Sequence, residues 1–198
     1  MKTLPSYPGH ALQRCRIRGR TFYTRITFRK KIMRQPRSVL VYPVKFVNQS
    51  WNWEYLLLHR VPRPDLGMPD FWQGISGAIQ RNETLEQAAA REVIEETGFK
   101  RFTIVSSNYS YAVSLQEQWC SLYPSGVKEI QEHVFLAFTD EKQDPVLSEE
   151  HDFWQWCSLE TALGLLKYPG NVEAMKRCSM SLSNFLSEIS GVLSESKV

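Results

Sequence analysis

The sequence lacks several features that would place it in a specialised class of protein. Its four cysteines show no C-x-x-C spacing, and no apolar run approaches the roughly 18 residues of a membrane-spanning helix. The N-terminus has no apolar core of the kind found in secretory signals. Gly and Pro together are only 20 of 198 residues, which argues against a collagen-like or disordered chain. We therefore expect a globular, cytoplasmic protein with reduced thiols and no membrane partner.

Acidic residues are absent from the first 37 residues, which contain eleven Lys and Arg. The rest of the chain has 13 basic residues against 21 acidic ones, so its body is acidic and does not favour nucleic-acid binding. The length fits one domain with an appendage. We place the domain at residues 37–198 and a basic N-terminal extension at residues 1–36.

Three interpretations of the extension remain open. An Arg-rich, acid-free N-terminus resembles a mitochondrial transit peptide, which would mean import into an organelle, but Ser is scarce here. Alternation of apolar and polar residues from Arg18 to Lys30 favours an added strand, and Met33 is an alternative start. We expect the extension to be dispensable for catalysis, and RNA binding through it is a further hypothesis.

Apolar periodicity predicts an α/β layered domain, because strand-like and helix-like segments are interleaved along the chain. The residues from Val61 to Gly77 are expected to form a loop, since they carry three prolines and three glycines. Strands are predicted at 38–47, 54–60, 104–113, 133–139 and 153–157, with a turn at 48–52, and helices at 84–97, 159–166 and 173–192.

The predicted helix at 84–97 carries an unusual cluster of carboxylates. Glu92, Glu95 and Glu96 are spaced i, i+3 and i+4, so their side chains share one face of the helix and repel each other. Few partners are available locally, because only Arg91 reaches Glu95 and Lys100 reaches Glu96 at that spacing. Oxygen clusters of this kind bind hard divalent cations, and a solvated charged surface is the alternative.

A longer motif surrounds this cluster. The segment GAIQRNETLEQAAAREVIEETGF, from Gly77 to Phe99, fills every fixed position of G-x5-E-x7-R-E-U-x-E-E-x-G-U, where U is a bulky apolar residue. That pattern is the Nudix box, so the chain resembles a Nudix hydrolase from about Arg37 to Asn171. The resemblance implies an αβα sandwich with a mixed β-sheet and the Nudix loop-helix-loop.

The resemblance also implies the roles of the box residues. Members hydrolyse a nucleoside diphosphate, or a similar diphosphate, linked to another group. Glu92, Glu95 and Glu96 match the carboxylates that hold Mg²⁺ or Mn²⁺, and the carbonyl of Gly77 matches a further metal ligand. Glu92 is our choice for the base that activates water. Glu83 and Arg91 match a supporting ion pair, so they are expected to be structural.

A further carboxylate from outside the box is common in this family. Glu132, in QEHVF, is the best match and is expected just before a strand, as a metal ligand. Its alternative role is an ordinary charge at a strand end, which Glu129 or Glu149 could equally represent.

Segments outside the box resemble dihydroneopterin triphosphate diphosphatases, which release pyrophosphate from a pterin triphosphate in folate synthesis. They are PDFWQGISG at 69–77 and YPSG with EHVFLAF between 123 and 138. Phe71, Trp72, Trp119 and Tyr123 could stack on a flat ring, although large aromatics are more often core residues. Arg60 could meet a phosphate, and a surface role is equally open.

These observations favour metal-dependent hydrolysis of a small phosphoanhydride, a nucleoside or pterin triphosphate, with dihydroneopterin triphosphate preferred. The alternative is a diadenosine polyphosphate hydrolase. That branch usually has W-Q-x-P-x-G before its box, whereas this chain has Ile75 in the place of the proline. A non-catalytic nucleotide-binding Nudix module is the hypothesis of another class, but such proteins typically lose box residues. The oligomeric state is left open.

Overall fold

The structure is a computed structural model that describes residues 10–17, 20–27, 33–47, 52–139 and 143–195. Contacts within the chain divide it into two units, Met1–Met33 and Arg34–Val198. In the first unit, β1 (His10–Ile17) pairs with β2 (Arg20–Thr27) as an antiparallel two-stranded sheet. The strand expected between Arg18 and Lys30 therefore corresponds to β2, and β1 is its partner among the described strands.

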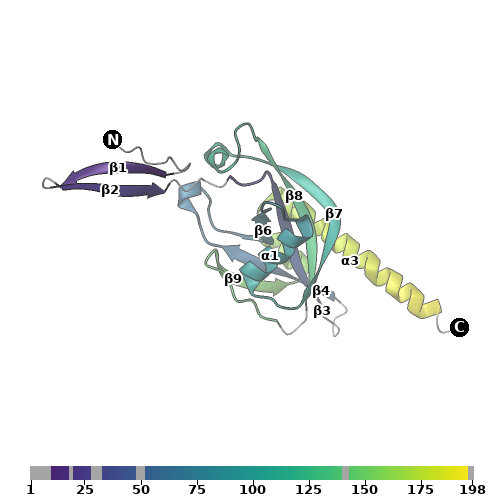
Figure 1. The fold of residues 1–198 in the computed structure, drawn as a ribbon. Helices are drawn as coiled ribbons and strands as arrows, with labels where there is room; N and C mark the ends of the chain where they lie inside the picture. The colour runs from purple at the N-terminus through teal and green to yellow at the C-terminus, as the bar shows by residue number, and fades with distance from the viewer. Residues whose placement is uncertain (1–9, 18–19, 28–32, 48–51, 140–142, 196–198) are drawn as a thin grey trace. The chain divides into compact units, whose positions relative to one another are not determined.

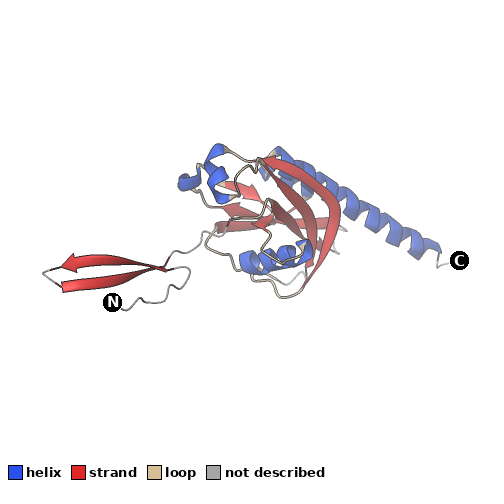
Figure 2. Ribbon diagram, turned by 45° about the horizontal axis from the view of Figure 1, so that its top comes forward, coloured by secondary structure: helices blue, strands red, loops and turns tan. Residues whose placement is uncertain are grey.

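The second unit is a mixed β-sheet with helices on both sides, as Figures 1 and 2 show. Its strands are β3 (Arg37–Val47), β4 (Asn52–Arg60), β5 (Phe71–Gln73), β6 (Ile75–Ala78), β7 (Phe102–Ser114), β8 (Glu129–Thr139) and β9 (His151–Cys157). Its helices are α1 (Leu85–Thr97), α2 (Leu159–Leu165) and α3 (Pro169–Glu195), with short 3-10 turns η1 (Pro64–Leu66) and η2 (Glu117–Leu122). The αβα sandwich expected from the sequence is confirmed.

The central strand β3 is buried on both faces, which explains its continuous apolar sequence. Side chains alternate across a strand, so Val39 and Val41 pack in the cluster that includes α1, whereas Leu40 and Tyr42 pack against α2 and α3. The same alternation divides β8, where Phe135 faces α1. Each face of the sheet thus has its own core.

Strands β3 and β4 separate at one end of the sheet. They pair over Val44–Val47 and Asn52–Tyr55, but nearer its start β3 pairs with β6, and the end of β4 pairs with β5. β9 covers the other edge of β4, and β3 and β8 form the one parallel pair among the described strands. β5 and β6 therefore occupy the space between the two diverging strands, and β6 lies against α1.

Helix α1 begins and ends where the sequence predicts. The Thr84 hydroxyl accepts the backbone N–H of Gln87, and the Gln87 side chain accepts that of Thr84, which completes a capping box. At the other end Gly98 has φ 67°, a left-handed conformation that glycine adopts without a steric cost. Ala88, Ala89 and Val93 are fully buried under the helix, so one face is fixed on the sheet.

Three expectations about local structure are wrong. The loop predicted from Val61 to Gly77 contains η1, β5 and most of β6, because tertiary pairing with β4 and β3 overrides the local Pro and Gly content. Glu132 lies inside β8 instead of before it, since β8 begins at Glu129. Helix α3 begins at Pro169, a residue that is well tolerated in a first helical turn. The turn expected at 48–52 lies, except for Asn52, outside the described residues.

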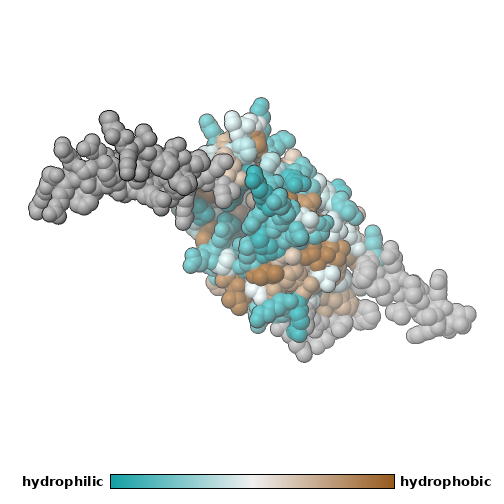
Figure 3. Space-filling view, in the orientation of Figure 1, coloured by the Kyte–Doolittle hydropathy of each residue, from teal (hydrophilic) through white to brown (hydrophobic). Residues whose placement is uncertain are grey.

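None of the helices in the described part of the chain combines the length and the apolar character needed to cross a bilayer. The face of the molecule seen in Figure 3 is mainly hydrophilic across its centre, with apolar patches toward its lower side.

Candidate active site

Gly77, at the end of β6, lies directly against the carboxylate of Glu92 on α1. A Cβ atom at position 77 would overlap the Glu92 carboxylate, so only glycine permits this close approach. Glu92 and Glu96 are both 7% exposed. The Glu95 side chain is half exposed. Of the box carboxylates named from the sequence, the structure therefore places Glu92 against the Gly77 backbone.

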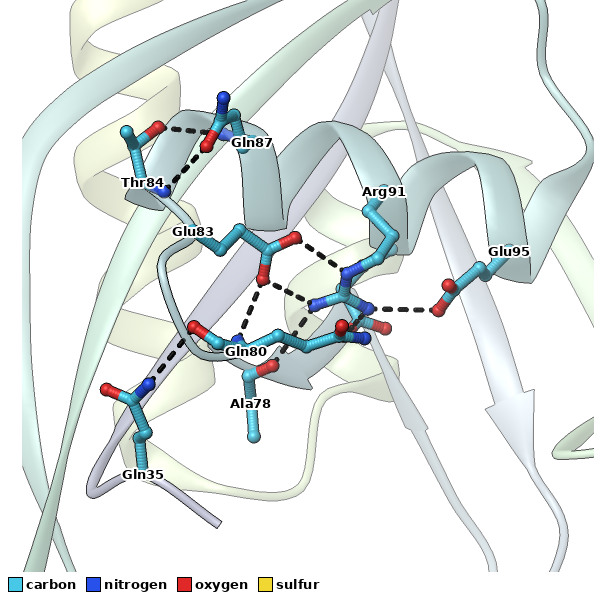
Figure 4. A network of polar contacts seen from close by, with 9 residues as sticks. Gln35, Ala78, Gln80, Glu83, Thr84, Gln87, Arg91 and Glu95 are labelled. Atoms are coloured by element: carbon cyan, nitrogen blue, oxygen red, sulfur yellow. Dashed lines mark hydrogen bonds and ion pairs between the residues drawn. The ribbon is translucent and has the colours of Figure 1, made fainter. Parts of the chain in front are cut away.

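Arg91 organises this helix face, as Figure 4 shows. Its Nε and Nη2 donate to Glu83 at 2.8 and 3.1 Å, and Nη2 also donates to the carbonyl of Ala78 at 3.1 Å. Its Nη1 donates to Glu92 at 2.6 Å and to Glu95 at 3.0 Å. One guanidinium thus ties the loop before α1 to the helix.

The contact between Arg91 and Glu92 is one that helical spacing alone does not predict. Neighbours in sequence point in different directions on a helix, yet the long Arg91 side chain reaches back to Glu92. Burial raises the pKa of Glu92, and the charge of Glu95 and Glu96 adds to that rise, while Arg91 opposes it. Within the described residues, Arg91 donates to Oε1 of Glu92 and no hydrogen bond is made to Oε2.

Glu96 is held by residues far away in the sequence. His151 Nδ1 lies 2.8 Å from Glu96 Oε2, and the hydroxyl of Ser148 donates to the same oxygen. Burial alone would raise the pKa of Glu96, but these two hydrogen bonds and the charge of Arg60 lower it overall. Sequence reasoning missed His151 and Ser148, because nothing local predicts that the start of β9 and the residues before it pack on α1.

A pocket of about 380 Å³ is lined by residues of β3, β5, β6, β7 and β8 and of the start of α3. That volume is within the roughly 300–1,000 Å³ of small-molecule sites. Its walls include the aromatic residues Phe71, Tyr111, Trp119 and Tyr168 and the polar residues Ser38, Gln73, Ser76, Glu132 and Asn171.

Two short chains of contacts connect the pocket to the box. Gln73 lines the pocket, and its Nε2 lies 3.4 Å from His151 Nε2, whose ring bonds Glu96 through the other nitrogen. Ser76 also lines the pocket and immediately precedes Gly77 in β6. The pocket is therefore connected to Glu96 through Gln73 and His151, and to Gly77 through its neighbour Ser76.

Glu132 lies in this pocket and not among the box carboxylates. The hydroxyls of Ser38 and Ser76 donate to Oε1 at 3.3 and 3.1 Å, and the Tyr111 hydroxyl donates to Oε2. Burial raises the pKa of Glu132, and these three donors lower it by less. The alternation of β8 places Glu132 on the α3 side of the sheet, together with Val134 and opposite Phe135.

The remaining predicted contacts divide into two groups. Phe71 lines the pocket, whereas Trp72 packs against His59 with ring centroids 5.1 Å apart, and Tyr123 is buried at the end of η2. Arg60 Nη2 pairs with Glu150 at 2.6 Å, and its buried Nε has no hydrogen-bond partner among the described residues. Of the predicted aromatics, the structure thus brings Phe71 and Trp119 to the pocket, and not Trp72 or Tyr123.

The donor chemistry of α1 suits a hard divalent cation. Carboxylate oxygens of Glu92, Glu95 and Glu96 lie on one helix face, and the carbonyl of Gly77 is adjacent. Within the described residues no three carboxylate, His or Cys side chains already converge as a metal-binding set, and Arg91 contacts two of these glutamates. Binding a cation would therefore require the glutamates to turn away from Arg91.

Comparison with known proteins agrees with this geometry. The NUDIX domain model matches residues 35–178. Dihydroneopterin triphosphate diphosphatase of Escherichia coli K12 is 30% identical over 152 residues, which are 74% of this chain and 94% of that protein. Bis(5'-nucleosyl)-tetraphosphatase of Caenorhabditis elegans is 27% identical over 117 residues, which are 59% of this chain and 80% of that protein.

The solved structure of the E. coli dihydroneopterin triphosphate pyrophosphohydrolase matches with a TM-score of 0.62 and 25% identity, covering 76% of this chain and 99% of that one. An octanoyltransferase of Myxococcus xanthus is 36% identical over 124 residues, which are 63% of this chain and 32% of that protein. The chain therefore matches about a third of that longer relative.

The fold, the box and these relatives place the chain among hydrolases that act on phosphoanhydrides. It belongs to the Nudix family. Enzymes of this family generally use divalent metal ions and act on small phosphoanhydride substrates.

Proposed function

We propose that this protein hydrolyses a nucleoside or pterin triphosphate to a monophosphate and pyrophosphate, with dihydroneopterin triphosphate preferred and Mg²⁺ or Mn²⁺ required. The observation that carries the proposal is the position of the pocket. Its aromatic walls suit a flat ring, and Gln73 and His151 connect it to Glu96 on α1. The similarity to the E. coli diphosphatase supports the choice of substrate.

The proposed reaction uses the chain's own residues in distinct roles. Divalent metal held by Glu92, Glu95, Glu96 and the Gly77 carbonyl would neutralise the phosphates and make a bound water more acidic. Water adds to the phosphorus on one side of the α–β bridging oxygen, and the bond from that phosphorus to the bridging oxygen breaks. Glu92 Oε2 is our assignment for the atom that accepts the proton of the water.

Arg60 is the proposed phosphate contact. Its charge lies close enough to Glu96 to lower the pKa of that carboxyl, and its Nε has no partner among the described residues. A buried guanidinium N–H without an acceptor is costly, and a phosphate oxygen would satisfy it. Glu150 already pairs with Nη2 of the same guanidinium, so a phosphate would share Arg60 with that carboxylate.

A screen of substrates tests the proposal. Hydrolysis products are separated and quantified by liquid chromatography for dihydroneopterin triphosphate, dNTPs, diadenosine tetraphosphate, ADP-ribose and nucleotide sugars, with Mg²⁺, with Mn²⁺ and with chelator. We expect the highest kcat/KM with the pterin substrate and none with chelator. Hydrolysis of no compound, together with nucleotide binding, would instead indicate a non-catalytic binding module.

Diadenosine tetraphosphate is the second candidate substrate, because the C. elegans relative is named for such an activity. Ile75, which stands where that branch usually has proline, counts against it. A kcat/KM for diadenosine tetraphosphate ten-fold above that for the pterin substrate, about 1.4 kcal/mol of transition-state preference, would reverse the order of the two candidates.

A further inference from the structure

The carboxylate of Glu132 lies in the pocket without a cationic partner among the described residues. Its three hydrogen bonds come from the neutral hydroxyls of Ser38, Ser76 and Tyr111. A carboxylate in a buried position is costly unless hydrogen-bond donors compensate it. A carboxylate offers about four acceptor positions, so three hydroxyl donors leave at least one open, on Oε2.

The position of Glu132 does not suit a ligand of the same metal as the α1 carboxylates. Glu132 is on the side of the sheet that packs against α2 and α3, whereas α1 packs on the opposite side. None of its hydrogen-bond donors comes from α1. Glu132 instead lines the same pocket as the aromatic walls.

Those walls are already ordered by contacts within the protein. Phe71 and Tyr168 meet edge to face with ring centroids 4.9 Å apart. The indole N–H of Trp119 donates to the carbonyl of Leu66 at 3.0 Å, which fixes the ring plane. Aromatic faces held in this way bind a flat ring at little cost in side-chain entropy, but they do not distinguish one ring from another. Discrimination must come from the polar groups of the pocket.

We propose that Glu132 selects the ring of the substrate, by accepting hydrogen bonds from a ring N–H and the neighbouring amino group of a 2-amino-4-oxopyrimidine, the edge that pterins and guanine share. This inference deepens the proposed function and rests on it for the triphosphate part of the substrate alone. One donor would occupy the open position on Oε2. The other would replace Ser38 on Oε1, whose contact at 3.3 Å is the longest of those with a stated distance.

The hydrogen-bonding edges of the other nucleic-acid bases explain why Glu132 would select a 2-amino-4-oxopyrimidine ring. The 2-amino-4-oxo edge presents two adjacent donors, which match the two oxygens of a carboxylate. Adenine and cytosine present an amino donor next to a ring acceptor, so one carboxylate oxygen would face a lone pair. Uracil and thymine present a ring N–H between two carbonyls, which also repel a carboxylate.

Tyr111 is the positioning residue of this arrangement. Its hydroxyl donates to Glu132 and lies 3.0 Å from Asn171 Oδ1 at the start of α3. Gly170 permits this contact, because a Cβ there would overlap the Tyr111 ring. The strands β7 and β8 and the helix α3 thus meet at Glu132, and they lie side by side in Figure 1.

Binding of unphosphorylated rings tests the inference without hydrolysis or metal. The affinities of the full chain for neopterin, guanosine and adenosine are measured by calorimetry in the presence of chelator. We expect neopterin and guanosine to bind at least ten-fold more tightly than adenosine, and their ratio tells which of the two rings the pocket prefers. Equal or tighter binding of adenosine would overturn the inference, even for a protein that hydrolyses triphosphates.

The variant Glu132→Gln separates ring selection from metal binding. The amide nitrogen of the substituted side chain would face an N–H donor of the ring in place of a carboxylate oxygen. The affinity for the preferred ring should therefore fall roughly 10–100-fold, whereas that for adenosine should change less than about two-fold. Mn²⁺ affinity, measured by electron paramagnetic resonance, should stay unchanged. Loss of Mn²⁺ affinity with unchanged ring binding would show a metal ligand instead. Glu129→Gln, an exposed change on the same strand, is the matched control and should alter neither affinity.

If Glu132→Gln does not fold, Tyr111→Phe provides a second variant. It removes one donor to Glu132 and keeps the ring in the wall. The preference for neopterin or guanosine over adenosine should then shrink several-fold, with Mn²⁺ affinity unchanged. An unaltered preference in a folded Tyr111→Phe variant would contradict the role of this hydroxyl in holding Glu132.

Discussion

The contact between Gly77 and Glu92 predicts that Gly77→Ala reduces activity much more than stability. The added Cβ would overlap the Glu92 carboxylate, which must move by more than about 1 Å to reach ordinary van der Waals contact. Gly77 has no positive φ, so alanine introduces no backbone strain there. Misplacing a catalytic group by about 1 Å can lower turnover roughly 100-fold.

The main stability cost that we expect is the loss of one hydrogen bond. The displaced carboxylate loses its 2.6 Å bond from Arg91 Nη1, and a charged hydrogen bond contributes about 1.5–3 kcal/mol. Because Arg91 keeps its bonds to Glu83, we expect the free energy of unfolding to fall by about 1–2 kcal/mol. The melting temperature should then fall by only a few degrees.

Steady-state kinetics and thermal unfolding of Gly77→Ala test this prediction together. Gly164→Ala is the matched control, because nothing lies within 4 Å of the added Cβ on α2. That control should keep its activity and gain stability slightly, since alanine favours a helix over glycine by about 0.5–1 kcal/mol. Activity of Gly77→Ala within two-fold of the wild type would refute the reasoning about Glu92.

Two more predictions concern the hydrogen bonds of the box. Glu83→Gln should lower the free energy of unfolding by about 2–3 kcal/mol in chemical denaturation, because it breaks a largely buried pair with Arg91. Its control is Glu173→Gln, which breaks an exposed pair and should cost under about 0.5 kcal/mol. Equal losses of stability in the two variants would contradict the role of the buried pair. Ser148→Ala should raise the pKa of Glu96, whose folded value is lowered. The stability from this bond is therefore present above the unfolded pKa of about 4.3 and disappears as the pH falls through the lower folded pKa, so unfolding curves should differ at pH 7 and converge in acid.

The secondary structure of the box was predictable because its signals are local. The capping box at Thr84 and Gln87 and the glycine at position 98 define both ends of α1 before any tertiary contact is known. The buried strand β3 was equally clear, since its apolar run is continuous. The short strands β5 and β6 were not, because they owe their existence to pairing with β4 and β3, and Pro and Gly nearby indicate a loop.

The site was predictable only where the motif spans it. The long-range contacts were not predicted, because no local pattern in the sequence indicates that His151 bonds Glu96 or that Tyr111 bonds Glu132. The position of Glu132 depends on the register of β8 and on which face each residue takes. A shift of one residue reverses the face, so a motif match cannot settle that position.

The most direct test of the central claim is ³¹P NMR of dihydroneopterin triphosphate incubated with the full chain and Mg²⁺. We predict conversion to dihydroneopterin monophosphate and pyrophosphate, none with chelator, and a loss of orders of magnitude in Glu92→Gln and Glu96→Gln, both still folded by circular dichroism. Turnover near the wild-type level in both variants, or release of single phosphate in place of pyrophosphate, would contradict the account.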